Sequence, residues 1–537
     1  RLSRDPITMA TIDRVSSPGT RARAAMFEKI SGSTPRPKKP RKFRPAEWVW
    51  EWICFILNPF AVGRYILGKV IELIVALTIA VRFLYVSMFG LPGTGGVQPI
   101  AQIVEDEGYH VSTHLIRTRD GYKLVAFRIR ARRRELAARV SVSAITGDAA
   151  EAAKNKDLNK NKASGTVLLW HGLLDDAFTW VAQGKRRSLA YLLADQGFDV
   201  WLGNNRGNCY GQSHDYLNPN DCEFWNFSWD EMIKFDLPDT ITYIQNTLKE
   251  EGKVGPNGEG VKLSYVGHSE GTTQMFGLLS DHPKLASKLC SFVALGPVGK
   301  VGNISSTALT TLANWNLDKL VWWMGFRSSF MMLQGSSEHL FISFAAYIAP
   351  SLVDMIITLL CGPSNSPMSS PEQRKTWGSH EPGGTSILNV AHWCQSIRQK
   401  SFQKYDYGEK LNKKRYGRPR PPMYDVENIP KKLPKLLVRG TKDALVGAKD
   451  FEWLVSQLSS RSSMKDGLSV VQLPNWNHTD YLWDKNAHIE VYPHVMEFLK
   501  EHQQWHHVHQ SEIKMSGSLR PESKKRKGST RPAGDRS

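Results

Sequence analysis

A serine between two glycines ends the stretch Val261–Gly271, which reads Val-Lys-Leu-Ser-Tyr-Val-Gly-His-Ser-Glu-Gly. The apolar residues before the turn are typical of a strand and a helical pattern follows it, so Ser269 lies at the apex. Side chains at Gly267 and Gly271 would clash where strand and helix approach each other, so the glycines allow strained backbone geometry that exposes the hydroxyl. The pattern predicts a nucleophilic serine for acyl transfer. An ordinary strand–helix turn is the alternative interpretation.

A serine hydroxyl needs a base to remove its proton, and the base needs an acid to orient it. The strand-like run Lys435–Arg439 is followed by a short loop that ends in Asp443, and the run Leu468–Leu473 by one that ends in His478. Both therefore lie on loops after strands, in the chain order nucleophile, acid, histidine that doubly wound hydrolases use. We predict Asp443 as the acid and His478 as the base, with Asp450 as the alternative acid.

Two backbone N–H groups are needed to stabilise an oxyanion. The residue directly after the nucleophile, Glu270, offers one of them from the start of the following helix. The loop after the strand Thr166–Trp170 reads His-Gly-Leu-Leu, and its glycine lets the loop approach the serine. We predict the N–H of Leu173 as the second donor and a structural role for His171.

Strand-like and helix-like stretches alternate along the chain, which predicts an α/β fold with a mostly parallel sheet covered by helices on both faces. A hairpin is expected around Asp120-Gly121. The other expected strands and helices are Thr166–Trp170, Ser188–Gln196, Phe198–Leu202, Phe235–Glu250, Ser291–Leu295, Lys435–Arg439, Leu468–Leu473 and His488–Glu501. Residues 300–400 break this alternation with three long apolar stretches, Leu312–Leu320, Val321–Leu333 and His339–Leu360. We interpret them as a helical cap inserted into the core, with ordinary helical core as the alternative.

Charge is concentrated at the two ends of this 537-residue chain, whose net charge is +19. Residues 1–44 contribute twelve Lys/Arg and three acids (+9), and residues 514–537 contribute eight Lys/Arg and two acids (+6). Positive tails beside an apolar segment fit an anionic membrane surface better than nucleic acid, so we expect no nucleic-acid partner. Solvated tails that bind no partner are the alternative interpretation. The six scattered cysteines form neither a C-x-x-C pair nor a metal-ligand spacing.

An apolar, tryptophan-rich segment follows the first basic tail, and we interpret it as a membrane anchor. A single span near Ile66–Phe89 and two helices joined around Asn58-Pro59 are alternative geometries, because charges interrupt every run before about 20 residues. The predicted organisation is a disordered basic tail (1–45), the anchor (46–95), the first part of the core (96–299, with a flexible insertion at 131–165), the cap (300–400), the second part of the core (401–505) and a disordered basic tail (506–537).

Several stretches together resemble the acid lipases, a family that includes gastric and lysosomal acid lipase and the fungal steryl ester hydrolases. They are His171–Leu174, Val200–Asn208, Phe224–Met232, Gly267–Thr272, Tyr405–Gly408 and Asn477–Tyr481. The resemblance covers about residues 100–500. It implies an α/β-hydrolase fold with a cap, a Ser269–Asp443–His478 triad, oxyanion donors at Leu173 and Glu270, and no metal or organic cofactor.

The sequence departs from the family pattern at two places. Secreted members usually have glutamine after the nucleophile, whereas this chain has Glu270, whose side chain we expect to point outward. The apolar N-terminal segment stands in place of a cleavable signal, which resembles the fungal, membrane-bound steryl ester hydrolases. That likeness favours a lipid droplet, the endoplasmic reticulum or the plasma membrane over a lysosome.

The sequence therefore predicts a membrane-anchored hydrolase that cleaves steryl esters to sterol and fatty acid through an acyl-enzyme. A triacylglycerol lipase with the same machinery is the nearest alternative, and an acyltransferase differs only in the acceptor of the acyl group. A catalytically silent lipid-binding or tethering protein is the alternative of another class. In each case the expected partners are a hydrophobic ester or lipid and a membrane or droplet surface.

Overall fold

The computed structural model describes most of the region between the two tails. The described residues are 98–131, 165–255, 260–316, 328–331, 350–364, 377–378, 380–459, 467–503 and 507–508. The predicted N-terminal tail, the anchor at 46–95 and nearly all of the insertion at 131–165 lie outside these ranges, so they stay predictions. None of the helices within the described ranges is long and apolar enough to span a bilayer.

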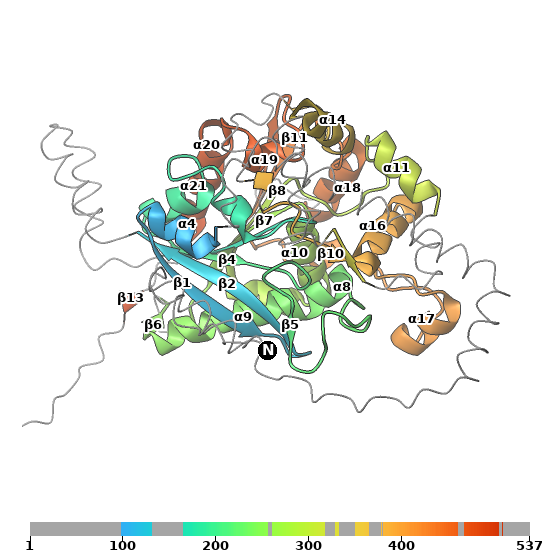
Figure 1. The fold of residues 1–537 in the computed structure, drawn as a ribbon, viewed down its shortest axis with the longest axis horizontal. Coiled ribbons are helices and arrows are strands. Elements are labelled where there is room, and N and C mark those ends of the chain that lie inside the picture. Colours follow the sequence, from blue (N-terminus) through green and yellow to red (C-terminus); the bar gives the residue numbers. More distant parts are fainter. Residues whose placement is uncertain are drawn as a thin grey trace, which may run out of the picture.

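A nine-stranded sheet forms the centre of the described structure, in the order β1-β2-β4-β3-β7-β8-β11-β12 with β5 paired to β2 (Figure 1). Its members are β1 (His110–Arg117), β2 (Tyr122–Arg130), β3 (Thr166–Trp170), β4 (Asp199–Gly203), β5 (Ser213–His214), β7 (Leu263–His268), β8 (Leu289–Leu295), β11 (Lys435–Gly440) and β12 (Leu468–Leu473). The six strands from β4 to β12 in this order pair in parallel, while β1, β2 and β5 are antiparallel. The predicted fold class, a mostly parallel sheet with helices, is confirmed.

Helices cover both faces of the sheet because its central strands are apolar on both sides. In β3, Leu168 packs into one core cluster, whereas its neighbours Val167 and Leu169 pack into the other. The first cluster includes residues of α9 (Leu237–Glu250), α10 (Glu270–Asp281) and α18 (Ala448–Leu458). The second includes residues of α4 (Ile100–Asp106), α7 (Leu189–Asp195) and α21 (Tyr492–His502).

Shorter elements connect or flank these strands and helices. They are α8 (Trp229–Glu231), a π-helical turn (Met232–Asp236), α19 (Asp480–Trp483), α20 (Ala487–Glu490), the 3-10 turns Ala177–Trp180, Pro283–Lys288 and Val426–Asn428, and the strand pair β6 (Lys253–Val254) and β13 (His507–Val508).

Two expectations about the C-terminal region are wrong. The single helix expected at His488–Glu501 is divided into α20 and α21, because Pro493 lies in the first turn of α21 and cannot donate to a preceding carbonyl. His507 and Val508, which we assigned to the disordered tail, form β13 and pair antiparallel with Lys253 and Val254 of β6. Backbone pairing with an exposed strand edge supplies partners that a sequence pattern does not predict.

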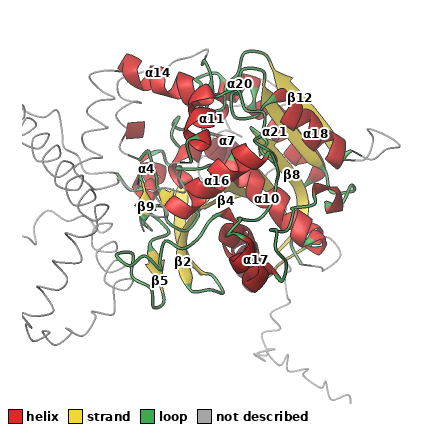
Figure 2. Cartoon of the chain, turned by 90° about the vertical axis from the view of Figure 1, so that its right-hand side faces the viewer, coloured by secondary structure: helices red, strands yellow, loops and turns green. Residues whose placement is uncertain are grey.

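Between β8 and β11 the chain forms the helices α11 (Thr307–Asn314), α14 (Pro350–Cys361), α16 (Ile387–Gln399) and α17 (Glu409–Tyr416), with the short strand pair β9 (Ser329–Phe330) and β10 (Thr385–Ser386). Figure 2 shows α16 next to α10 of the core, with α11 and α14 nearby. The helix expected at Leu312–Leu320 ends earlier than predicted, at Asn314. Much of the other two predicted stretches lies outside the described residues, so the limits of the cap at 300 and 400 stay predictions.

Candidate active site

Ser269 lies between β7 and α10 with a strained backbone, at φ 52° and ψ −118°. A Cβ atom on Gly267 would come within 2.9 Å of the backbone carbon of Gly271, and one on Gly271 within 2.7 Å of the Trp170 carbonyl oxygen. Both obstacles are backbone atoms of neighbouring elements, which cannot move aside cheaply. The two glycines are therefore required for the close approach of strand, helix and loop that presents the serine.

His478 lies on the loop after β12, and its ring contacts the serine hydroxyl. Its Nε2 is 2.7 Å from Ser269 Oγ, and its Nδ1 is 2.9 Å from each carboxylate oxygen of Asp443. An ionised carboxylate can only accept hydrogen bonds, so Nδ1 carries the proton and Nε2 offers a lone pair to the serine hydroxyl. In this tautomer the histidine can take the proton from Oγ as the oxygen attacks.

Asp443 is held by several donors besides the histidine. One of its oxygens accepts from the backbone N–H groups of Leu445 and Val446, each at 2.9 Å, and the other accepts from the Tyr481 hydroxyl at 3.1 Å. Burial alone would raise the pKa of Asp443, but the charge and hydrogen bond of His478 and the two backbone donors bring it below its usual value. The carboxylate therefore remains ionised beside the imidazole.

The structure also decides between the two acids that the sequence left open. Asp450 lies in α18 and accepts from the backbone N–H of Asn303 at 2.6 Å and from its amide at 2.7 Å. These contacts tie α18 to the chain after β8, and none of them involves His478. Asp443 is thus the carboxylate that meets the histidine.

Tyr481 is a residue of this site that we did not single out from the sequence. Its hydroxyl accepts from the backbone N–H of Gly440 at 2.6 Å and donates to Asp443, so it bridges the end of β11 to the acid. It lies three positions after His478, on the first turn of α19. Its place in the motif Asn477–Tyr481, close to the predicted base, is the signal in the sequence that could have indicated it.

The predicted oxyanion loop lies against the serine. A Cβ atom on Gly172 would be 3.0 Å from the Cβ of Ser269, so a glycine is needed there for the approach. The next residue is Leu173, as the sequence predicts. Glu270 is the first residue of α10, where a backbone N–H has no acceptor within the helix. The loop that carries one predicted donor and the helix start that carries the other therefore both adjoin the nucleophile, and their role as oxyanion donors stays a prediction.

His171 has structural contacts, as expected. Its Nε2 accepts from the backbone N–H of Asn205 at 3.1 Å, and it is buried. His268 is a further residue that sequence reasoning missed. Its Nε2 is 2.9 Å from the carbonyl oxygen of His478, and because a carbonyl can only accept, Nε2 carries the proton. Burial lowers the pKa of His268 to about 3, so the ring is neutral and supports the backbone of the base.

The expectation that the Glu270 side chain points outward is wrong. The residue is 1% exposed, and its carboxylate accepts from Gln274 at 3.2 Å, Asn389 at 2.8 Å and Trp393 at 2.7 Å. Burial raises its pKa, and these three hydrogen bonds act in the opposite direction. The carboxylate faces α16 because that helix supplies two of its donors, a tertiary contact that the local sequence does not reveal.

The C-terminal end of α14 contacts both loops of the site. The carbonyl of Cys361 accepts from the backbone N–H of Ala444 at 3.1 Å and of His478 at 3.3 Å. The carbonyl of Gly362 accepts from the amide of Asn477 at 2.9 Å. Figure 1 shows α14 beside β11 and α19, in agreement with these contacts. The end of α14, which lies in the predicted cap, therefore helps to fix the loops that carry the acid and the base.

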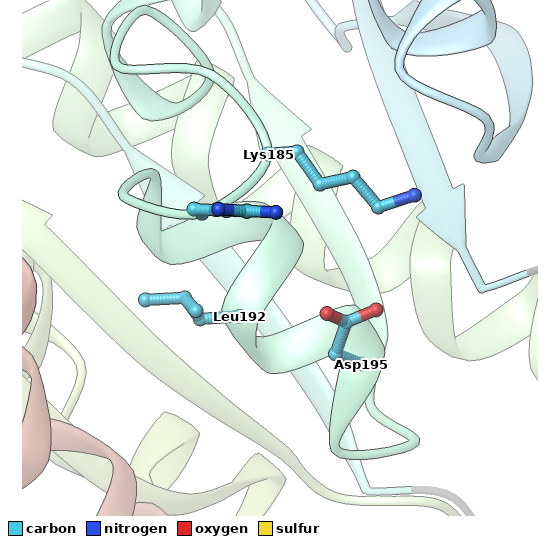
Figure 3. A pocket seen from close by; sticks show the side chains of 4 residues that line it. Lys185, Leu192 and Asp195 are labelled. Atoms are coloured by element: carbon cyan, nitrogen blue, oxygen red, sulfur yellow. The ribbon is translucent and has the colours of Figure 1, made fainter. Parts of the chain in front are cut away.

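An open surface pocket of about 500 Å³ lies elsewhere, along α7 and the turn before it (Figure 3). It is lined by Lys185, Arg186, Leu192 and Asp195. None of these residues belongs to the site around Ser269, so we assign the pocket no part in the chemistry.

Two family models match the chain, one described as a partial alpha/beta-hydrolase lipase region at residues 100–184 and one as the alpha/beta hydrolase fold at residues 165–485. Gastric triacylglycerol lipase of Bos taurus is 32% identical over 410 residues, covering 75% of this chain and 91% of the relative. Lysosomal acid lipase/cholesteryl ester hydrolase of Homo sapiens is 30% identical over 407 residues, with the same two coverages. The chain belongs to the acid lipase family.

A soluble variant of monoglyceride lipase from Saccharomyces cerevisiae is among the similar solved structures, at 14% identity and a TM-score of 0.41, covering 76% of this chain and all of that one. Membership of the acid lipase family makes this chain a carboxylic ester hydrolase of the lipase type. The resemblance drawn from its motifs is confirmed.

Proposed function

We propose that this acid lipase cleaves steryl esters to sterol and fatty acid, with Ser269 as nucleophile, His478 as general base and acid, and Asp443 as the residue that orients the histidine. The observation that carries the proposal is the continuous hydrogen-bonded chain from Ser269 Oγ through the imidazole to Asp443, at 2.7 and 2.9 Å. These distances are those at which a proton can pass from a nucleophile to its base.

In the first half of the reaction, Ser269 Oγ attacks the ester carbonyl carbon while its proton moves to Nε2 of His478. The carbonyl oxygen becomes an oxyanion, which the N–H groups of Leu173 and Glu270 stabilise. Asp443 keeps its charge and stabilises the imidazolium. The bond from the carbonyl carbon to the alcohol oxygen then breaks, and the proton on Nε2 passes to that oxygen. The sterol leaves, and the fatty acyl group remains on the serine.

In the second half, a water molecule takes the place of the sterol. His478 removes a proton from the water as its oxygen attacks the acyl carbon. Collapse of the second oxyanion breaks the bond to Ser269 Oγ, which recovers the proton from Nε2. Fatty acid is released and the free enzyme is restored. An alcohol acceptor in place of water would give the acyltransferase reaction instead.

The choice of substrate rests on the likeness to membrane-bound steryl ester hydrolases and on the relatives' names, one of which includes cholesteryl ester hydrolase. The basic tail and the apolar segment at 46–95 support anchoring to a droplet surface or to the endoplasmic reticulum. The other named relative acts on triacylglycerol, which makes a triacylglycerol lipase the alternative.

The test uses purified full-length protein and a Ser269→Ala variant, each given cholesteryl oleate or triolein in matched mixed micelles. We expect release of fatty acid from cholesteryl oleate at a rate several times that from triolein, and none above background with the variant. Faster release from triolein would replace the steryl ester assignment with the lipase. Equal release by the Ser269→Ala variant would refute the catalytic site.

A further inference from the structure

We propose that Glu270 is a positioning residue whose carboxylate ties the nucleophile turn to the cap helix α16 and so fixes the oxyanion donor on its own backbone. The inference deepens the proposed function and rests on it. The backbone and the side chain of Glu270 have different surroundings. The N–H of Glu270 lies at the start of α10 beside the nucleophile, where we place an oxyanion donor, while its side chain is buried and bonded to α10 and α16.

The carboxylate is the point where donors from two helices converge. From α10, the amide of Gln274 donates to one oxygen at 3.2 Å. From α16, the amide of Asn389 and the indole N–H of Trp393 donate to the other oxygen at 2.8 and 2.7 Å. Charge-assisted bonds of this length are stronger than neutral ones. The cap helix is therefore attached to the residue next to the nucleophile by two such bonds.

The direction of these hydrogen bonds is fixed by two groups that can only donate. The indole of Trp170 donates to the side-chain oxygen of Gln274 at 2.9 Å, so the nitrogen of that amide must face Glu270. The indole of Trp393 donates from the other side. An acceptor is thus required at both oxygens of residue 270. A carboxylate meets this requirement, whereas an amide places an N–H against another donor.

Helix α16 is itself fixed to the core near these contacts. The ring of Trp393 packs edge-on against Trp229 with their centroids 4.2 Å apart. The hydroxyl of Ser386 accepts from the backbone N–H of Asn389 at 3.0 Å and donates to the carbonyl of Phe227. The donors therefore do not follow the carboxylate freely. A change at residue 270 is instead transmitted to the start of α10, where the oxyanion donor lies.

A swap of two side chains tests this inference. In Glu270→Gln the new amide nitrogen faces the amide nitrogen of Gln274, and we expect kcat to fall roughly tenfold with KM within about twofold of wild type. In the double variant Glu270→Gln/Gln274→Glu the carboxylate moves from residue 270 to residue 274, within the same row of hydrogen bonds that runs from Trp170 to Trp393. Donor and acceptor then alternate again from Trp170 to Trp393, so we expect kcat to return to within roughly threefold of wild type.

The measurement is steady-state hydrolysis of p-nitrophenyl butyrate, a soluble ester that needs no lipid surface, by the full chain in detergent. Glu231→Gln is the matched control, because Glu231 accepts from the backbone N–H of Ser228 at 2.8 Å and lies outside the site. We expect that control to keep its kcat. Trp393→Phe removes the indole N–H that α16 donates to Glu270, and we expect roughly a threefold loss of kcat. Its control is Trp225→Phe, whose indole donates to the carbonyl of Pro219, and we expect no loss of kcat there.

The outcomes separate this inference from the function on which it rests. Unchanged kcat in Glu270→Gln, or a double variant no more active than Glu270→Gln alone, would overturn the role of Glu270 while leaving the ester hydrolase intact. A wild-type protein without Ser269-dependent hydrolysis would overturn the proposed function, and the role of Glu270 with it. Loss of activity together with a matching loss of folded protein, measured by circular dichroism, would show a structural role and also overturn the inference.

Discussion

Replacing Asp443 with asparagine tests whether this buried carboxylate is the acid that orients His478. The asparagine oxygen can still accept from the two backbone N–H groups, of Leu445 and Val446, that hold one carboxylate oxygen at 2.9 Å. The amide nitrogen then faces Nδ1 of His478, where the carboxylate accepted before. Nδ1 lies 2.9 Å from both positions, so the remaining oxygen is still within its reach, but the amide N–H beside that oxygen opposes a proton on Nδ1 and favours the tautomer in which Nε2 carries it. The histidine then presents an N–H to Ser269 and cannot take the serine proton.

The size of the effect follows from the loss of the base. A wrong tautomer in a serine hydrolase triad costs about 10⁴-fold in kcat, which corresponds to about 5.4 kcal/mol at about 1.36 kcal/mol for each factor of ten. The change is isosteric and keeps the backbone contacts, so we expect the free energy of unfolding to fall by only about 1–3 kcal/mol. The separation of these two quantities distinguishes a catalytic from a structural role.

The assay is hydrolysis of p-nitrophenyl butyrate with thermal unfolding measured on the same preparations. Asp450→Asn is the control, since Asp450 is the other acid on the same stretch of chain and bonds to Asn303 rather than to the histidine. We expect that variant to keep kcat within about threefold of wild type while losing about 1–3 kcal/mol of stability. Activity of Asp443→Asn within tenfold of wild type, or an equal loss of kcat in Asp450→Asn, would refute the assignment of the acid.

Three further predictions concern the surroundings of the site. Gly271→Ala places a Cβ atom 2.7 Å from a backbone carbonyl oxygen. We expect thermal unfolding to show a loss of about 2–3 kcal/mol of stability, and ester hydrolysis to show the loss of most activity. The control Gly260→Ala, whose Cβ atom would have nothing within 4 Å, leaves both unchanged. Tyr481→Phe removes the hydroxyl donor to Asp443, and we expect roughly a tenfold lower kcat with an unchanged KM; an unaltered kcat would contradict the bridge. Burial raises the pKa of Asp480 from 3.8 to about 6, so between these values the folded protein holds a proton that the unfolded chain has lost, and stability falls as pH rises. We therefore expect Asp480→Asn to remove up to about 2 kcal/mol of the fall between pH 4.5 and pH 7, measured by urea unfolding at the two values. An identical pH dependence in both proteins would count against it.

The sequence was sufficient to predict how the three chemical residues come together. Ser269, Asp443 and His478 each follow a strand, and the strands that precede them have the boundaries expected to within about two residues. In a parallel sheet the carboxyl ends of the strands meet at one edge, so residues far apart in the chain converge there. This is a consequence of periodicity and chain order, both of which are visible in the sequence.

The sequence did not predict the contacts that hold these residues from outside their own loops. Burial of the Glu270 side chain depends on Asn389 and Trp393, which lie more than a hundred positions away on a helix whose docking no local pattern encodes. The carbonyl of Cys361 is bonded by loops that follow two different strands, and a backbone acceptor carries no signal in its residue type. Tertiary partners of this kind appear only once the elements are packed.

The break between α20 and α21 was not predicted, although a residue in the sequence indicates it. Pro493 was visible, and the missing N–H of a proline within a helical pattern indicates that a helix starts or ends nearby. The apolar spacing of the stretch gave a continuous helix instead. The anchor at 46–95 cannot be judged in this way, because it lies outside the residues that the structure describes, and it remains a proposal.

The most direct test of the central claim is to locate the nucleophile chemically. Full-length protein would be treated with a fluorophosphonate, digested, and its labelled peptide sequenced by mass spectrometry. The account predicts one phosphonylated residue, Ser269, with labelling abolished in Ser269→Ala and slowed by roughly the same 10⁴-fold in Asp443→Asn as hydrolysis. Labelling of a different serine, or a folded protein that does not react at all, would contradict it.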